Sequence, residues 1–540
     1  MTETQSARPS GSSRLLRSSA VVGVGTAISR LTGFGRVAAV AYAFGATTVA
    51  GVYAYANETP NILYELLLGG ILTATLLPLF VRSLADGDEE AQNAIVTVAG
   101  VALLVITIIG IAIAPLIVRI YTIDVHGPTA DDQRELATTW LRCFMPQIFF
   151  YGLTALAADM LNARRRFAAA AFAPILNNIV VITMFLSLPR LVDGPITLET
   201  VVDDPQLTLY IGLGTTAGIA TMALALWPAL RRAGVRLRLV FAWRHAAVRM
   251  MLRLSGWTVG YVITNQIALW VVLVLANSKS AGAFVYLSAY AFFQLPHGLF
   301  AVSITTASQP DLAGAFVSNN WLGFRYRFAR GMRLILTLMI PAAALYIGLA
   351  QPIVAALLQR GAFDANDTER VADALRMFAI GLPAFSLYLY SLRGFYSMQD
   401  TRTPFLLNCF ENALNIVGAL ILFPILGLPG LALAFAAAYT IASVVTITVM
   451  SRRLGGLRGR QIGTTALRVG IVGAVVGGVT WFVAERMGSS TPSEAIFTTI
   501  VGGTVGIAIG IAGLWLLRVR ELSELREAFR PAPREITVSP

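Results

Sequence analysis

The sequence has little of what soluble enzymes and small secreted domains depend on. Only 13% of its 540 residues are charged, and it contains 2 cysteines and 3 histidines. Cys143 and Cys409 both lie in apolar stretches, so they predict packing residues rather than a disulfide framework. The histidines form no HExxH pattern or paired metal-ligand spacing, and no Gly-rich phosphate loop is present. We therefore expect a protein that is not an enzyme and that needs no cofactor or bound transition metal.

Long apolar runs dominate the chain instead. Hydrophobic residues make up 56% of the sequence, and its mean hydropathy of +0.70 is well above that of a soluble domain. A bilayer-spanning helix needs about 20 mostly apolar residues, and such runs recur along almost the whole chain. The sequence predicts an all-α integral membrane protein with about fourteen transmembrane helices, at 18–44, 48–81, 94–118, 135–161, 168–189, 207–230, 254–276, 283–311, 333–357, 372–398, 404–424, 428–450, 463–484 and 494–517.

The distribution of basic residues predicts the orientation. A formal net charge of +12 is compatible with nucleic-acid binding or with membrane topology. Most of the 41 Lys and Arg residues fall in the termini and in alternate loops on one side of the predicted helices, which is the positive-inside pattern. This pattern favours anionic membrane lipids over nucleic acid as partners. Both termini are predicted to be cytoplasmic in a plasma-membrane protein, and the N-terminal segment has no signal-peptide cleavage pattern.

The two halves of the chain carry the same few proline, arginine and asparagine residues at one constant offset in the sequence. Aligning 153–180 with 390–417 superimposes a basic hairpin residue and an asparagine: Arg165 with Arg402, and Asn178 with Asn415. At the same offset, Pro146 corresponds to Pro383. Each half is therefore predicted to contain a proline-broken helix, a short basic hairpin and a further helix. Transporters built from repeats enclose a central site near the bilayer midplane.

This internal similarity predicts two six-helix lobes around a central cavity, followed by two extra helices. The predicted organisation is an N-terminal cytoplasmic tail, an N-lobe, a basic cytoplasmic linker, a C-lobe, the extra helix pair and a C-terminal cytoplasmic tail, at 1–17, 18–230, 231–253, 254–450, 463–517 and 518–540.

Two arginines, Arg30 and Arg36, interrupt the first predicted helix with no acidic residue beside them. An arginine at the bilayer centre costs from about 2.5 to more than 10 kcal/mol, so each must face a wet cavity or a charged partner. Either the two guanidinium groups bind an anionic substrate, or they pair structurally with an acid of the next helix such as Glu58 or Glu65.

The second predicted helix contains the polar stretch "ANETPNILYE". Pro60 removes one backbone hydrogen bond and is expected to kink the helix, a feature of midplane transport sites. Glu58, Asn61 and Glu65 are candidates for substrate contact, and a counter-ion role for the two glutamates is an equally good interpretation.

Polar residues also mark the eighth and eleventh predicted helices. Tyr290 and Gln294 are candidates for lining the cavity, with packing as the alternative. The eleventh helix carries four polar residues on one face, because they recur at i, i+3, i+4 and i+7. Carboxylate and amide oxygens suit a hard cation, whereas interhelical hydrogen bonding is the alternative. These four residues are Asn408, Glu411, Asn412 and Asn415.

Five stretches, in order along about residues 15–520, resemble the MurJ (MviN) family of lipid II flippases, part of the multidrug/oligosaccharidyl-lipid/polysaccharide exporter superfamily. They are "SRLTGFGRVAAVAYAFG" at 29–45, "PNILYELLLGGILTATLLPLF" at 60–80, "FFQLPHGLFAVSITTASQPDLA" at 292–313, "LLQRGAFDANDT" at 357–368 and "RGFYSMQDTRTP" at 393–404. The resemblance implies fourteen helices, two lobes around a cationic cavity, and a last helix pair that forms a groove for a lipid tail.

The resemblance also implies a function and a site. The expected activity is translocation of undecaprenyl-pyrophosphate-linked peptidoglycan precursor across the cytoplasmic membrane by alternating access. Arg30 and Arg36 match functional arginines of the family's first helix, and a guanidinium fork binds pyrophosphate oxygens bidentately. Lipid II is the expected substrate, the cell-wall synthesis machinery is a candidate partner, and Na⁺ or the membrane potential is the candidate driving force.

The chain departs from the family pattern at four positions. Tyr64 stands where the family has an arginine in helix two, and the family's helix-eight arginine falls at about Ala291. Gln294 stands at the position of the nearby glutamate, and Val37 at that of an acidic residue in the first helix. These differences resemble a divergent Gram-positive, actinobacterial-like branch. The alternative functions are export of another lipid-linked glycan or a drug, or a transport-inactive membrane scaffold of cell-wall synthesis.

Overall fold

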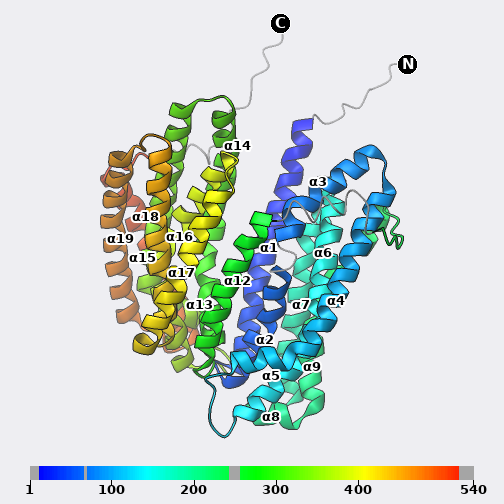
Figure 1. Ribbon diagram of the computed structural model, residues 1–540. Helices are drawn as coiled ribbons and strands as arrows, with labels where there is room; N and C mark the ends of the chain where they lie inside the picture. Colours follow the sequence, from blue (N-terminus) through cyan, green and yellow to red (C-terminus); the bar gives the residue numbers. More distant parts are fainter. Residues whose placement is uncertain (1–10, 66–69, 243–255, 522–540) are drawn as a thin grey trace, which may run out of the picture. The chain divides into compact units, whose positions relative to one another are not determined.

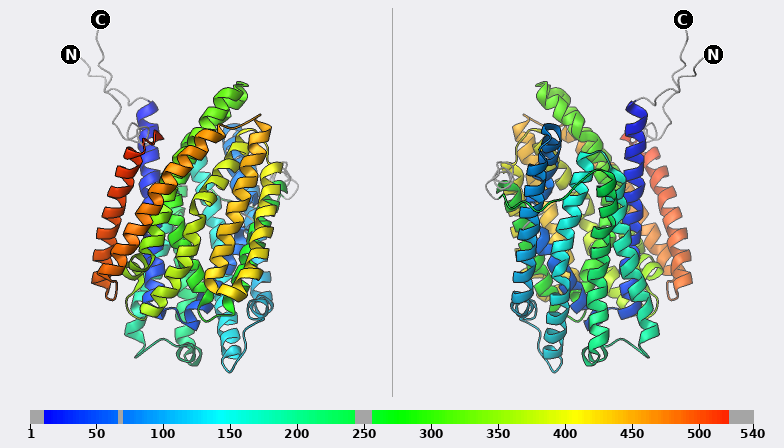
Figure 2. Two further views of the ribbon diagram at one scale, coloured as in Figure 1. Left: turned by 90° about the vertical axis from the view of Figure 1, so that its left-hand side faces the viewer. Right: turned by 90° about the vertical axis from the view of Figure 1, so that its right-hand side faces the viewer.

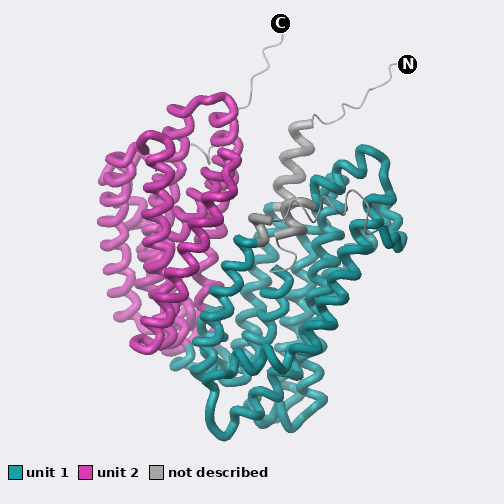
Figure 3. Tube along the Cα trace, in the orientation of Figure 1, with its two compact units in different colours: residues 1–288, 360–367 teal, residues 289–359, 368–540 magenta. Residues whose placement is uncertain are grey.

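The structure, a computed structural model, describes residues 11–65, 70–242 and 256–521, and every regular element in them is a helix (Figure 1). The all-α prediction is therefore confirmed. The chain divides into two compact units (Figure 3). Unit 1 comprises Met1–Ser288 with Arg360–Asp367, and unit 2 comprises Ala289–Gln359 with Thr368–Pro540.

Unit 1 is a bundle of long helices with two short ones. Its elements are α1 (Gly11–Phe44), α2 (Thr48–Tyr64), α3 (Gly70–Asp86), α4 (Glu89–Tyr121), α5 (Ala130–Phe144), α6 (Pro146–Ala163), α7 (Phe167–Leu191), α8 (Leu198–Asp203), α9 (Pro205–Ala225), α10 (Trp227–Arg232) and α12 (Gly256–Asn277). The next helix, α13 (Gly282–Pro296), crosses the boundary between the units.

Unit 2 continues from α13 through a π-helical turn, η2 (His297–Ala301), into further long helices. They are α14 (Val302–Val317), α15 (Trp321–Leu358), α16 (Ala365–Ser397), α17 (Arg402–Leu426), α18 (Leu428–Arg453), α19 (Gly459–Met487) and α20 (Pro492–Leu516). Residues Ala365 to Asp367 of α16 belong to unit 1.

Twelve helical segments among the described residues are long and apolar enough to cross a membrane. They correspond to the predicted helices from 94–118 onward, which makes the chain a multi-pass membrane protein. The predicted spans 18–44 and 48–81 correspond to α1 and to α2 with α3, which are not among the twelve, so a count of fourteen stays a prediction.

Local sequence signals explain where several helices begin. Asp88 caps α4, because its Oδ1 accepts a hydrogen bond from Ala91 N at 2.8 Å. At the start of α20, Thr491 and Glu494 form a reciprocal capping box, with Pro492 in the first turn. Such caps satisfy backbone N–H groups that have no partner inside the helix.

Aromatic side chains fill the centre of unit 1. Phe44, Tyr53, Trp140 and Phe185 are buried, and the Tyr53 and Phe185 ring centroids are 5.1 Å apart. Edge-to-face contacts at such distances add to the burial of apolar area. They hold the ends of α1 and α2 against α5 and α7.

The family-like stretch at 357–368 has a structural role in unit 1. Ala362 N donates to Tyr42 O at 2.9 Å, and Ala46 N donates to Asp367 Oδ2 at 2.8 Å. Gly361 has a φ of +64° and lies so close to Tyr42 that a Cβ would be 2.4 Å from the Tyr42 carbonyl oxygen. Only glycine fits there, because an added carbon would overlap the backbone.

Unit 2 has its own aromatic core between α13, α16 and α18. Phe293 contacts Phe385 with ring centroids 5.1 Å apart, and Phe435 contacts Tyr439 at 4.5 Å. The helices α19 and α20 run side by side and pack on α15 (Figure 2). Small residues make this close approach possible, as in many membrane helix pairs.

A buried ion pair ties the end of the described chain to α15. Arg333 Nε donates to Glu521 Oε1, and the two side chains are 9% and 5% exposed. Removing one partner of such a pair leaves an uncompensated buried charge, which costs about 3–5 kcal/mol. Glu521 therefore anchors the segment after α20 to unit 2.

One proline prediction needs correction. Pro146 does begin a new helix, α6, directly after α5, but Pro383 lies inside the uninterrupted α16. The α2 helix likewise continues through Pro60 to Tyr64. Membrane helices tolerate an internal proline because neighbouring helices and hydroxyl side chains compensate for the lost backbone bond. The kink expected at Pro60 stays a prediction.

The predicted lobe boundaries stay a prediction. Unit 1 extends beyond the predicted linker 231–253 as far as Ser288. The linker begins in α10, continues to residue 242 without regular structure, and its remainder lies outside the described residues. The tails 1–17 and 518–540 also lie largely outside them.

Candidate functional site

The helix α1 presents Arg30 and Arg36 differently. Arg30 is exposed and Arg36 is half-buried. Among the described residues, neither guanidinium group forms a hydrogen bond or an ion pair within 4 Å. The structural pairing considered for Arg30 is therefore absent from this part of the chain.

The face of α1 that packs on α7 is composed of small and hydroxyl residues. Asn178 Nδ2 on α7 donates to Ser29 O at 3.2 Å and to Thr32 Oγ1 at 3.0 Å. Gly25 lies so close to α7 that a Cβ there would be 3.0 Å from Ala171 Cβ. These contacts fix the rotation of α1 about its axis and leave the Arg30 side chain exposed.

Arg36 belongs to a polar cluster that three helices of unit 1 bring together. The cluster consists of Arg36 on α1, Glu58, Asn61, Tyr64 and Glu65 on or just after α2, and Tyr151 and Asp159 on α6. The Arg36 guanidinium lies near the Glu58 carboxyl group and the Tyr151 hydroxyl group, and Glu58 also hydrogen-bonds with Asn61. The structure thus places Arg36, Glu58, Asn61 and Glu65 together, as the interpretation of Glu58 as a counter-ion requires.

Two members of the polar cluster were missed by the sequence analysis. Asp159 interacts electrostatically with Tyr64, and the Tyr64 and Tyr151 rings are 5.6 Å apart. Asp159 carried a signal, since it is a carboxylic acid within an apolar span, which marks a functional candidate. Tyr151 had none, because an aromatic residue in a membrane helix is usually a packing residue. Tyr64, which stands at an arginine position of the family, therefore packs against α6.

The polar cluster holds more acids than bases. Three carboxyl groups, on Glu58, Glu65 and Asp159, are balanced by the single guanidinium of Arg36. Arg30, by contrast, forms no ion pair with any described acid.

Tyr290 and Gln294 lie in unit 2 on α13, separate from the unit that holds the arginines. Gln294 Nε2 donates to Tyr290 Oη. The Tyr290 ring contacts Phe293, Phe378 and Phe435, with centroids 5.7–5.8 Å away. Packing therefore accounts for the ring, while both side chains remain half-buried.

The polar face predicted on the eleventh helix is present on α17 and is buried. Asn408, Glu411, Asn412 and Asn415 are 0–6% exposed. Asn412 Nδ2 donates to Asn408 O at 2.9 Å. Tyr439 lies close to Glu411. Even so, the two carboxylate oxygens of Glu411 and the Oδ1 atom of Asn415 accept no hydrogen bond from the described residues. Buried oxygens in this state fit a cation, because a bound ion would replace the lost hydration.

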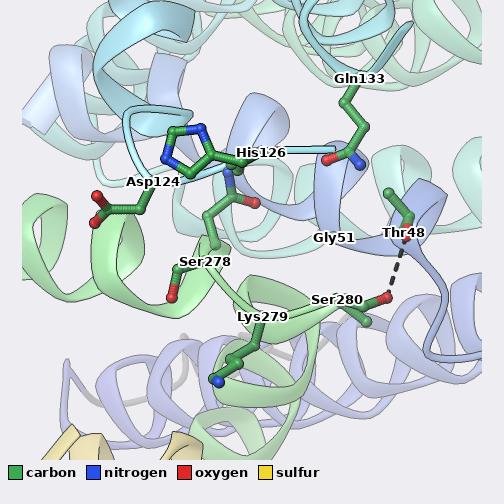
Figure 4. A pocket seen from close by; sticks show the side chains of 11 residues that line it. Thr48, Gly51, Asp124, His126, Gln133, Ser278, Lys279 and Ser280 are labelled. Carbon is green, nitrogen blue, oxygen red and sulfur yellow. Dashed lines mark hydrogen bonds between the residues drawn. The ribbon is translucent and has the colours of Figure 1, made fainter. Parts of the chain in front are cut away.

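A separate polar pocket of about 240 Å³ lies at the end of unit 1 where α2 begins (Figure 4). The segment after α4 contributes Asp124 and His126, and the turn before α13 contributes Lys279 and Ser280. Thr48 Oγ1 and Ser280 Oγ are hydrogen-bonded at 3.1 Å, which closes one side of the pocket. None of the predicted substrate residues lines it.

Comparison with known proteins identifies the family. The model of the family "Lipid II flippase MurJ" matches residues 40–499. The chain is 30% identical to a probable lipid II flippase MurJ of Rhizobium tropici over 506 residues, covering 92% of both chains. It is 29% identical to the corresponding Vibrio cholerae protein, covering 96% of this chain and 98% of the relative.

Solved structures agree on the fold. A lipid II flippase MurJ in an inward closed conformation matches with a TM-score of 0.75 at 19% identity, covering 94% of this chain and 99% of the other. An inward-facing MATE family transporter of the MOP superfamily matches with a TM-score of 0.63 at 16% identity, covering 80% and 98%. The family model spans most of the chain and the relatives align along nearly all of it, so this chain belongs to the lipid II flippase MurJ family.

Proposed function

We propose that this protein translocates lipid II, the undecaprenyl-pyrophosphate-linked peptidoglycan precursor, from the inner to the outer leaflet of the plasma membrane. It does so by alternating access, without making or breaking a covalent bond. Family membership supports the substrate. The observation that carries the site is Arg30, an exposed guanidinium on α1 with no hydrogen bond or ion pair among the described residues.

Arg30 and Arg36 have different parts in this proposal. A guanidinium binds two pyrophosphate oxygens at once, and a charge-assisted bond of this kind is about twice as strong as a neutral one. Arg30 supplies this fork. The charge of Arg36 is partly offset by Glu58, and Arg36 holds the polar cluster together. Arg36 therefore attracts the anionic headgroup less strongly than Arg30 does.

Three residues of the α2 region, Asn61, Glu58 and Glu65, then determine how far the pyrophosphate can move along α2. Glu58 and Glu65 repel a pyrophosphate that moves past the arginines, while Asn61 offers a neutral donor. Tyr290 and Gln294 are assigned to the sugar part of the headgroup, since an amide and a phenol hydrogen-bond to hydroxyl groups without adding charge.

The driving force is assigned to a monovalent cation at the polar face of α17. Glu411 supplies the negative charge, and the amide oxygens of Asn408, Asn412 and Asn415 complete an oxygen-rich environment. The buried, unbonded carboxylate oxygens of Glu411 support this assignment. The membrane potential acts on the same bound charge.

The orientation follows the basic residues. Both termini and the linker 231–253 are placed in the cytoplasm, since cytoplasmic loops carry the excess of Lys and Arg. The cell-wall synthesis machinery that consumes lipid II is the expected partner on the outer face, and α19 with α20 is assigned to the lipid tail.

Complementation tests the proposed function against its two rivals. The protein is expressed in a strain whose own lipid II flippase is depleted, and lipid II in the cytoplasmic leaflet is quantified together with growth. A flippase restores growth and prevents the accumulation. An exporter of another glycan or a drug, or an inactive scaffold, leaves lipid II accumulated although the protein is present in the membrane, and that result overturns the proposal.

A further inference from the structure

A groove on unit 1 lies between the C-terminal half of α4 and the helix α5. The two helices contact each other, and both are labelled in Figure 1. Its volume is about 400 Å³. Pro115 and Val118 form its apolar wall, and its polar lining consists of Arg119, Arg134, Glu135, Thr138, Thr139 and Arg142. Three arginines and one glutamate make it a basic recess, and it contains none of the residues assigned to lipid II.

The spacing of these residues places the basic groups along one line. Arg134, Thr138 and Arg142 are four residues apart on α5, so they share one face of the helix. Arg142 is about 12 Å farther along the axis than Arg134, at about 1.5 Å per residue. Arg119 approaches from the last turn of α4.

Arg134 is already committed to the protein. Its guanidinium donates to Val125 O at 2.9 Å and to Asp131 Oδ1 at 3.0 Å, and it also bonds Thr122. Arg119 and Arg142 differ from it. Both are exposed, and neither forms a hydrogen bond or ion pair with the described residues.

Arg142 lies within Ala130–Ala163, a helical segment that is long and apolar enough to cross a membrane. An exposed guanidinium in a membrane span is costly unless it reaches the headgroup region or an anionic partner. Glu135 lies seven residues before Arg142 and forms no ion pair with it among the described residues. The partner that the groove lacks is therefore an anion from outside the described chain.

The surface of α4 leading to the groove is suited to acyl chains. Its exposed residues between 104 and 116 are apolar: Leu104, Val105, Ile108, Ile109, Ala112, Ile113 and Leu116. They end at Arg119, so an apolar stripe runs directly into a cationic recess. An occupant must be apolar along its length and anionic at its head.

We propose that this groove binds the phosphate of an anionic glycerophospholipid, with its acyl chains along α4 and its phosphate between Arg119 and Arg142. The Thr139 hydroxyl adds a neutral donor at the same level. In the orientation proposed above, the bound lipid belongs to the outer leaflet, opposite the basic loops. The site is therefore a lipid site separate from the one that holds lipid II.

Native mass spectrometry of the full-length protein, released from bilayers of equal phosphatidylglycerol and phosphatidylethanolamine, tests this site. The wild-type protein should retain phosphatidylglycerol in preference. The double variant Arg119→Gln/Arg142→Gln should retain it about tenfold less, because each basic residue contributes to the attraction of an anionic lipid. Arg190→Gln, which removes an exposed arginine at the end of α7, is the matched control and should bind as the wild type does.

The unfolding temperature of each delipidated variant must match that of the wild type. A loss of bound lipid can then be attributed to the groove rather than to misfolding. Arg142→Lys should restore part of the retention, since charge remains. Equal retention of both lipids by the wild type, or unchanged retention by the double variant, overturns the proposal. Displacement of the bound lipid by undecaprenyl pyrophosphate at equimolar amounts would also overturn it, by making the groove a product site. This measurement does not use complementation. Failure of the lipid-site proposal can therefore be distinguished from failure of the proposed flippase function.

Discussion

Asn178 Nδ2 on α7 donates a hydrogen bond to Thr32 Oγ1 on α1 at 3.0 Å, two residues after Arg30. The helix that carries the proposed headgroup arginines is thus held by a buried amide. In the internal alignment Asn178 corresponds to Asn415, whose Oδ1 has no hydrogen-bond partner among the described residues. One position of the repeat therefore orients a helix, and its counterpart lies in the candidate cation site.

We expect Asn178→Leu to lower both thermal stability and transport. Interhelical hydrogen bonds in membranes contribute about 0.6 kcal/mol on average, so the change in stability should be small. A double-mutant cycle with Thr32→Val measures the coupling by thermal unfolding in detergent. If the two substitutions are simply additive, the hydrogen bond does not orient α1.

Arg30 and Arg36 of α1 should respond differently to substitution. Arg30→Ala should abolish complementation without loss of stability, because no described group depends on it. Arg30→Lys should complement in part, since an ammonium keeps the charge but lacks the bidentate fork. Arg36→Ala should also lower stability, because it leaves Glu58 without its nearby positive charge.

Growth, membrane abundance and unfolding temperature are measured together for these variants. Arg82→Ala is the control, since Arg82 forms only an exposed pair with Asp86 at 3.6 Å. Full complementation by stable Arg30→Ala protein would remove Arg30 from the headgroup site.

Sodium should stabilise the protein through Glu411. We expect the unfolding temperature to rise when NaCl replaces choline chloride at constant ionic strength, and Glu411→Gln to cancel this rise. The variant should be at least as stable as the wild type without sodium, since it removes a buried carboxylate that accepts no described hydrogen bond. Glu485→Gln, on the exposed side of α19, is the control. A sodium response that survives in Glu411→Gln places the cation elsewhere.

Acidic pH should remove the contribution of Asp400 to the stability of the fold. Asp400 lies in the hairpin before α17. Burial by itself would raise the pKa of Asp400, but hydrogen bonds from Thr403 and the Arg453 guanidinium outweigh it and hold that pKa below its ordinary value of 3.8. A lowered folded-state pKa stabilises the fold above the unfolded-state value, and this stabilisation is lost as the pH falls through the folded-state value.

Asp400→Asn should therefore lower the unfolding temperature at pH 7 and have progressively less effect below about pH 4. Unfolding curves of the two proteins across this range provide the measurement. A difference that is constant with pH would mean that the ionised carboxylate does not contribute.

Cysteine labelling tests the orientation in a background without Cys143 and Cys409. An impermeant thiol reagent added to intact cells should modify Ser280→Cys but not Leu239→Cys. Leu239 is a suitable probe because it is 80% exposed, so lack of labelling reflects the side of the membrane rather than burial. Ser12→Cys and Ser539→Cys should also be protected until the cells are opened. Labelling of Leu239→Cys from outside would invert the topology.

Much of the candidate site was accessible from the sequence, and the reason is electrostatic. Arg30, Glu58 and Glu411 are charged residues within apolar runs, and charge in a membrane span is expensive enough to indicate function wherever it occurs. The same argument applies to Asp159, which the sequence analysis passed over.

The sequence by itself determined the helical class and most spans, since apolar length and capping residues are local properties. The apolar run at 94–118 needed no distant partner to predict a helix there. Tertiary structure decided which residues meet. Asp367 bonds Ala46, 321 positions away, and Tyr151 reaches Tyr64 only because α6 packs beside α2. It also decided that Pro383 leaves α16 unbroken. Such outcomes depend on side-chain packing between helices that are remote in the chain, and no local pattern of residues carries that information.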